Sequence, residues 1–157
     1  LTQIGRHGDA VEPLENALVL LRADESEFFR EYEPQVLVLL ARCCLEKNLF
    51  SKGIRHLQTL RRFKHYGNGP ELYNSLGVLW LKQQNYTNAL DSFEEARSRS
   101  QSPVICQNIA VLYDLHLQSP DKARDYYIYS LAAASKINDT SMVPDIHRRL
   151  KQLAREH

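Results

Sequence analysis

Apolar residues recur along most of the chain at intervals of three and four, the spacing that places side chains on one face of an α-helix. This pattern predicts helices over residues 9–22, 34–47, 51–64, 70–83, 86–100, 103–117 and 120–135. A last segment, 140–157, carries Val143, Ile146, Leu150 and Leu153 on one face and basic residues elsewhere. We therefore expect an all-α protein that ends in an amphipathic helix.

Proline and capping residues mark where several of these helices begin. A capping residue precedes a Pro at Gly69-Pro70, Ser102-Pro103 and Ser119-Pro120, and Asn85 is a further cap. Because Pro has no N–H and a helix-like φ, it suits the first position of a helix. By the same argument, Pro144 places the start of the last helix a residue or two before Ile146.

The helices come in similar pairs. The second helix of each pair carries a small residue where two helices must approach closely, and these residues are Ala10, Gly53, Ala89 and Ala123. Their separations of 43, 36 and 34 residues predict a repeated helical hairpin.

The hairpin that begins at Pro70 has a recognisable signature. It reads Tyr73-x-x-Leu76-Gly77-x-x-Trp80 and then Ala89-x-x-x-Phe93-x-x-Ala96. This resembles the tetratricopeptide repeat (TPR), whose period is 34 residues. Weaker copies of the same signature join Ala110 to Ala123 and Ala41 to Gly53.

The resemblance implies a right-handed α-solenoid of about three and a half repeats. Its parts are a partial repeat at 1–22, an insertion at 24–33, repeats at 34–67, 70–102 and 103–135, and a closing helix at 140–157. The insertion is either a backward extension of the next helix or an acidic loop. Because the chain starts at Leu1 rather than at Met, we expect it to be a piece of a longer protein.

Composition and charge narrow the possible functions. With 157 residues and 43% hydrophobic content, the chain fits one globular domain and is not wholly disordered. A formal net charge of +1 gives no bulk attraction to DNA or to anionic lipid. The longest uncharged apolar run, Val36–Ala41, is far shorter than the roughly 20 residues that span a bilayer.

Nothing in the sequence indicates catalysis. There is no phosphate-binding glycine loop, nucleophile elbow or metal-spaced set of Cys and His, so we expect no enzyme, cofactor or metal site. Cys43 and Cys44 are adjacent on one helix and cannot chelate together, and Cys106 stands at a packing position of the repeat. Three cysteines form no disulfide framework, which favours a reducing compartment such as the cytoplasm or nucleus.

The resemblance also implies where a partner binds. In TPR proteins the first helix of each pair lines a concave groove, and its groove-facing positions here hold Gln35, Val38 and Arg42, then Glu71, Asn74, Val78 and Lys82, then Gln107, Asn108, Val111 and Asp114. Asn and Gln can bond the backbone of a partner peptide. The expected function is a non-catalytic protein-interaction module within a multiprotein complex, with a partner segment in this groove.

One kind of partner is not expected. TPR co-chaperones hold the acidic tails of heat-shock chaperones with Lys, Asn and Arg at set groove positions. Those positions here hold Val38, Arg42, Ser75, Val104 and Asn108, so most of the positive charge is missing.

Two other hypotheses remain open. The stretch 52–65 contains no acidic residue and carries Arg55, Arg61, Arg62 and Lys64, which suits an acidic partner, a phosphate or a nucleic acid, or simply a solvated helix end. The neutral total charge and the absence of a repeated basic stripe argue against nucleic acid. The partial first repeat suits a scaffold whose superhelix continues beyond this chain.

Overall fold

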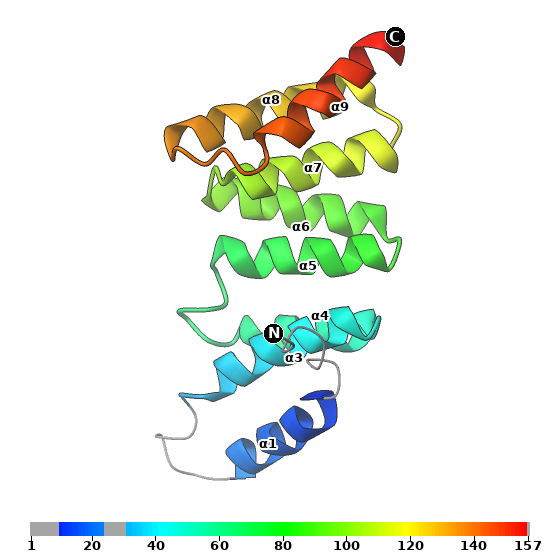
Figure 1. The fold of residues 1–157 in the computed structure, drawn as a ribbon. Helices are drawn as coiled ribbons and strands as arrows, with labels where there is room; N and C mark the ends of the chain where they lie inside the picture. The colour runs from blue at the N-terminus through cyan, green and yellow to red at the C-terminus, as the bar shows by residue number, and fades with distance from the viewer. Residues whose placement is uncertain (1–9, 24–30, 157) are drawn as a thin grey trace, which may run out of the picture.

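The computed structural model describes residues 10–23 and 31–156. In these residues it contains eight helices and no strand (Figure 1). The helices are α1 (Val11–Ala23), α3 (Glu33–Glu46), α4 (Phe50–Leu60), α5 (Pro70–Lys82), α6 (Tyr86–Arg99), α7 (Pro103–Leu115), α8 (Pro120–Lys136) and α9 (Val143–Glu156). The helices α3–α8 form three successive hairpins that stack in sequence order, with α1 at one end and α9 at the other. The all-helical α-solenoid expected from the sequence is confirmed.

Helix starts agree closely with the sequence. The helices α5, α7 and α8 begin at Pro70, Pro103 and Pro120, and Asn85 caps α6 by accepting a hydrogen bond from the Asn88 N–H at 3.2 Å. α9 begins at Val143, one residue before Pro144.

The end of α4 differs from the expected residue 64, because the helix stops at Leu60. From there the chain turns: the Phe63 N–H bonds the Leu60 carbonyl at 2.9 Å, and Phe63 packs against the core. Gly67 then returns so close to Arg61 that a Cβ at Gly67 would lie 2.7 Å from the Arg61 carbonyl oxygen. Four of the residues expected on the helix therefore lie in a turn.

One type of tight turn closes α3, α5, α7 and α8. Two or three residues beyond the end of each of these helices, a single residue adopts a left-handed φ: Asn48 (58°), Gln84 (62°), Gln118 (49°) and Asn138 (54°). Just after it, an N–H reaches back to a carbonyl of the last turn, as Leu49 does to Cys44 at 2.8 Å and Asn85 does to Trp80 at 2.9 Å. These bonds satisfy carbonyls that the helix end leaves free and fix the angle of the next helix.

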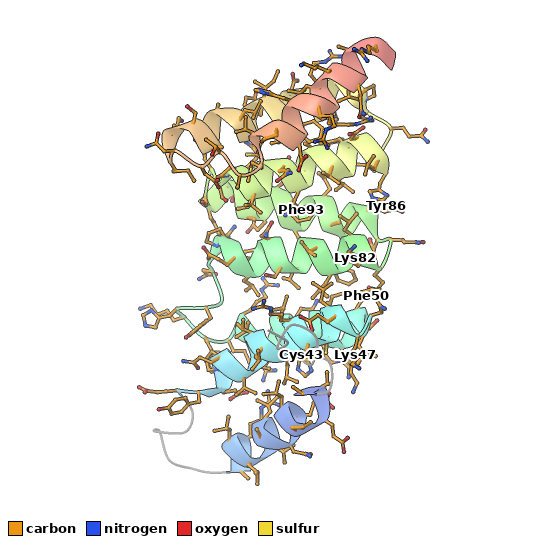
Figure 2. The ribbon with its side chains drawn as sticks, in the orientation of Figure 1. Cys43, Lys47, Phe50, Lys82, Tyr86 and Phe93 are labelled. Carbon is orange, nitrogen blue, oxygen red and sulfur yellow. The ribbon has the colours of Figure 1, made fainter. Side chains whose placement is uncertain are left out.

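The core lies between the helices of each hairpin and between neighbouring hairpins. Phe93 of α6, labelled in Figure 2, is fully buried. A Cβ at Gly77 of α5 would lie 2.5 Å from its Cε1, so the two helices approach closely there. One hairpin earlier, Gly53 of α4 faces Leu79 and Cys44. The expectation that small residues mark close helix approach therefore agrees with the observed packing.

Each end of the stack is covered by one helix that buries apolar residues. α9 buries Ile146 and Leu153 against the hairpin formed by α7 and α8. α1 buries Val11 and Leu18 and packs mainly against α3, and its Glu15 pairs with Lys52 of α4 at 3.1 Å.

Most of the expected acidic insertion, 24–30, lies outside the described residues, as do residues 1–9 of the partial first repeat. The last residues of the insertion form a turn, and α3 begins at Glu33. Within the described part of the chain, no helix is both long and apolar enough to span a bilayer.

Candidate partner-binding groove

The helices α3, α5 and α7 carry the residues expected to line the groove. Gln35, Val38, Arg42, Glu71 and Lys82 are exposed, and Asn74, Val78, Gln107, Asn108 and Val111 are half-buried. Val38 keeps 45% of its surface accessible, which is high for an aliphatic residue in the middle of a helix.

Four of these residues share one hollow. Val38 and Arg42 of α3 and Asn74 and Val78 of α5 line a cavity of about 250 Å³ between the two helices. Leu45 and Ser75 extend its walls, and buried Ala41, Leu57 and Leu79 complete its lining. The hollow is mainly apolar, with one guanidinium and one carboxamide at its edge. A partner's aliphatic side chain fits this setting, with Arg42 and Asn74 available for polar contacts.

The carboxamides of Asn74 on α5 and Asn108 on α7 form a hydrogen bond. Asn108 Nδ2 of α7 donates to Asn74 Oδ1 of α5 at 2.8 Å. Within the described part of the chain, this leaves Asn74 Nδ2 as a donor and Asn108 Oδ1 as an acceptor without protein partners. Such a pair matches the donor and acceptor of a peptide backbone.

Asp114 differs from the other expected groove residues. Its side chain is only 2% exposed, and Arg149 of α9 binds it with two hydrogen bonds of 2.7 Å each. The Tyr127 hydroxyl donates a third at 3.0 Å. The bonds from Arg149 are the main reason that the pKa of Asp114 lies below its usual value. We therefore assign Asp114 to the attachment of α9 and not to a partner surface.

The basic residues of the 52–65 stretch do not gather at one place. Arg62 and Lys64 line a separate hollow of about 650 Å³ together with Gln35 and Tyr66. Arg61 is close enough to Glu95 of α6 to contribute to the lowered pKa of that carboxyl, although a hydrogen bond from Arg99 is its main cause. Arg55 lies on α4 outside this hollow.

All three cysteines are buried among packed side chains. Cys43 and Cys44 are fully buried and Cys106 is 5% exposed. Burial is the main reason that all three thiols have a raised pKa, which lowers their reactivity as nucleophiles. No group of three or more His, Cys, Asp or Glu side chains in the described residues is placed to hold a metal ion.

Sequence reasoning missed a tyrosine cluster on the other side of α7. Tyr113 and Tyr126 stack with ring centroids 5.7 Å apart, and Tyr129 meets Tyr126 edge-on at 5.9 Å. The density of tyrosines in α8 was the available signal, but only Tyr127 stood at a repeat position. The cluster lines a further hollow beside α6.

Three solved structures are similar to this chain. The crystal structure of BtubC (BKLC) from P. vanneervenii has a TM-score of 0.71 at 19% identity, over 100% of this chain and 68% of that one. MamA has a TM-score of 0.62 at 14% identity, over 99% of this chain and 97% of that one. The APC/C hetero-tetramer Cut9-Hcn1 has a TM-score of 0.65 at 23% identity, over 93% of this chain and 28% of that chain.

Comparison of the sequence with models of protein families and with curated proteins gives no match. The likeness to the solved structures is therefore a likeness of fold alone. It agrees with the α-solenoid expected from the sequence.

Proposed function

We propose that this chain is a non-catalytic protein-interaction module that binds a segment of a partner protein in the groove formed by α3, α5 and α7. The observation that carries the proposal is the hollow between α3 and α5. It combines an exposed apolar residue, Val38, with a guanidinium and a carboxamide on a rigid helical frame. Interaction sites are commonly built from apolar anchor pockets surrounded by a few polar groups.

The arrangement of polar groups favours a peptide as the occupant. The hydrogen bond from Asn108 Nδ2 to Asn74 Oδ1 holds the two carboxamides together. Their remaining atoms, Asn74 Nδ2 and Asn108 Oδ1, can donate to a C=O and accept from an N–H of one partner backbone. Arg42 adds a positive charge at the α3 edge of the groove. A segment with an aliphatic side chain for the hollow and a carboxylate near Arg42 satisfies all three features.

A substitution at Val38 tests the proposal. Val38→Glu places a carboxylate in the apolar hollow, and because Val38 is exposed, the helix itself tolerates the change. The matched control is Val19→Glu on α1, where the valine is 66% exposed and lies outside the hollow. We expect a partner captured from native extract by the wild type and by Val19→Glu to be lost with Val38→Glu. Equal capture by Val38→Glu, or loss with Val19→Glu alone, contradicts the groove and favours a scaffold role for the end of the stack.

The second candidate is phosphate or nucleic-acid binding at the hollow beside Arg62 and Lys64, where Tyr66 could stack on a base. The structure gives it less support, since Lys52 is paired with Glu15 and Arg55 lies outside this hollow. Oligonucleotide binding that weakens steeply with salt and is abolished by Arg62→Ala with Lys64→Ala would favour it. No binding at low salt would remove it.

A further inference from the structure

A hollow of about 700 Å³ lies between α6 and α8, on a different side of α7 from the groove. We call it the α6–α8 hollow. Cys106 and Tyr113 of α7 line it, whereas Gln107 and Val111, one or two residues away along the helix, belong to the groove side. Its volume lies within the range of sites that hold a ligand or a large side-chain cluster.

The previous hairpin shows why this hollow is open. Tyr73 is the fourth residue of α5, and the guanidinium of Arg99, the fourteenth residue of α6, lies 4.3 Å from the centre of its ring. The same positions of α7 and α8 hold Cys106 and Ala133. Both replacements are large to small, so the space that a ring and a guanidinium fill in one hairpin is empty in the next.

The aromatic wall of the hollow is held in place. The Tyr126 hydroxyl donates a hydrogen bond to Glu94 of α6, which also accepts one from Arg97 at 2.7 Å. Burial and the neighbouring carboxylate raise the pKa of Tyr126, so its hydroxyl stays protonated as the donor. Tyr129, at the edge of this wall, is 57% exposed. Rigid, exposed aromatic side chains are frequent anchors of binding surfaces.

Charge around the hollow is unbalanced. Lys122 and Lys136 of α8 line it about 21 Å apart along the helix, and neither forms an ion pair with a carboxylate in the described residues. Arg97 is already paired with Glu94. Among the described lining residues, Asp125 is the single carboxylate. Lys122 lies over the Tyr113 ring, with its Nζ 5.0 Å from the ring centroid, and Lys136 lies one turn beyond Ala133. These two cations outnumber the one lining carboxylate, so the charge of the hollow is positive.

We propose that the α6–α8 hollow is a second binding site, separate from the groove, for an acidic segment of a partner protein. A large apolar side chain of that segment fills the space above Cys106 and beside Ala133, against Tyr126 and Tyr129. Carboxylates of the segment meet Lys136 and Lys122. The charge favours an acidic segment, and the apolar floor favours one that carries an aromatic or long aliphatic residue.

Selection from a library of random displayed peptides of about 12 residues, long enough to reach both lysines, tests the proposal. Peptides are selected on the wild type and depleted on Ala133→Arg, which puts back the guanidinium found at Arg99. We expect the surviving peptides to combine Asp or Glu with a large apolar residue. The absence of survivors, or survivors without acidic residues, overturns the proposal.

A labelled surviving peptide then gives the affinities by fluorescence anisotropy. We expect Ala133→Arg to weaken binding about 30-fold or more, as expected for a blocked anchor pocket, and Lys136→Glu to weaken it and reduce its salt dependence. Ile128→Arg adds the same side chain at an exposed position of α8 outside the hollow, and it should leave the affinity within about threefold. Equal loss with Ile128→Arg contradicts the site.

Two further variants keep the test independent of folding and of the groove. Tyr129→Ala removes an exposed ring and adds no bulk to the hollow. If the site is correct, this variant should also bind the peptide more weakly. Val38→Glu should leave the peptide's affinity unchanged. If Val38→Glu weakened peptide binding and Tyr129→Ala did not, the peptide would bind in the groove and the second site would be refuted.

Discussion

The contact between Gly77 and Phe93 predicts that Gly77→Ala destabilises the protein, although Ala favours helices over Gly. A Cβ at Gly77 would lie 2.5 Å from Cε1 and 2.9 Å from Cγ of the Phe93 ring. Carbon atoms in contact prefer about 3.5 Å or more, so the ring or α5 must move by about 1 Å. Phe93 is fully buried, so its ring can move only if its neighbours shift as well.

Two opposing effects set the magnitude. Overpacking a filled core costs about 1–3 kcal/mol, and a displacement of this size lies near the upper end. The change from Gly to Ala inside a helix returns about 1 kcal/mol. We therefore expect Gly77→Ala to lower the free energy of unfolding by about 2 kcal/mol.

Gly53→Ala is the matched control. Its Cβ would lie 3.2 Å from two methyl groups of Leu79 and 3.3 Å from Cys44 Cβ, so the neighbours need to give by only a few tenths of an ångström. Because Gly53 lies in the first turn of α4, the gain in helix propensity is also smaller. We expect a free energy of unfolding within about 0.5 kcal/mol of the wild type.

Urea unfolding followed by circular dichroism measures both variants. Phe93→Leu in the Gly77→Ala background should recover part of the loss, because the smaller side chain leaves room for the new methyl group, giving a coupling of about 1 kcal/mol or more. Gly77→Ala with stability equal to the wild type, or no coupling to Phe93, would refute the close approach of α5 and α6.

The remaining predictions concern α9 and the thiols. Asp114→Asn should cost about 2 kcal/mol, because Arg149 loses its charged partner. Because folding lowers the pKa of Asp114, the stabilisation from its carboxylate is present above the unfolded pKa of about 4 and is lost as the pH falls through the folded value. Urea midpoints measured from about pH 7 to pH 3 should therefore fall less steeply for Asp114→Asn than for the wild type. Identical slopes would contradict this role of Asp114. In the native protein near pH 7.5, iodoacetamide should react slowly with all three thiols, and first with Cys106. The urea-unfolded chain should react quickly, and mass spectrometry of the labelled peptides measures both rates. Rapid labelling of Cys43 or Cys44 in the native protein would contradict the packing of α3 on α4.

The helices could be predicted from the sequence because their signals are local. Pro70, Pro103 and Pro120 mark helix starts through the chemistry of a single residue. The end of α4 could not be placed in this way, because residues 61–66 contain no Gly or Pro and the chain turns to bury Phe63. That turn depends on tertiary packing.

The candidate sites show the same limit. Repeat positions placed Val38, Arg42, Asn74 and Val78 around one hollow, because a regular stack preserves which face of a helix is outward. They misplaced Asp114, whose surroundings depend on the reach of Arg149 from another helix.

The α6–α8 hollow was missed for a similar reason. It arises because Cys106 and Ala133 are small where the previous hairpin has the ring of Tyr73 and the guanidinium of Arg99. Only a comparison of the two hairpins in three dimensions shows this difference.

The most direct test of the central proposal is photo-crosslinking from the groove. A photoreactive residue placed at Val38 reports the partner that lies over the hollow between α3 and α5, and the same residue at Val19 is the control. The groove model predicts that a partner protein is crosslinked from position 38 and not from position 19. Crosslinking from position 19 alone, or equally from both, would contradict it.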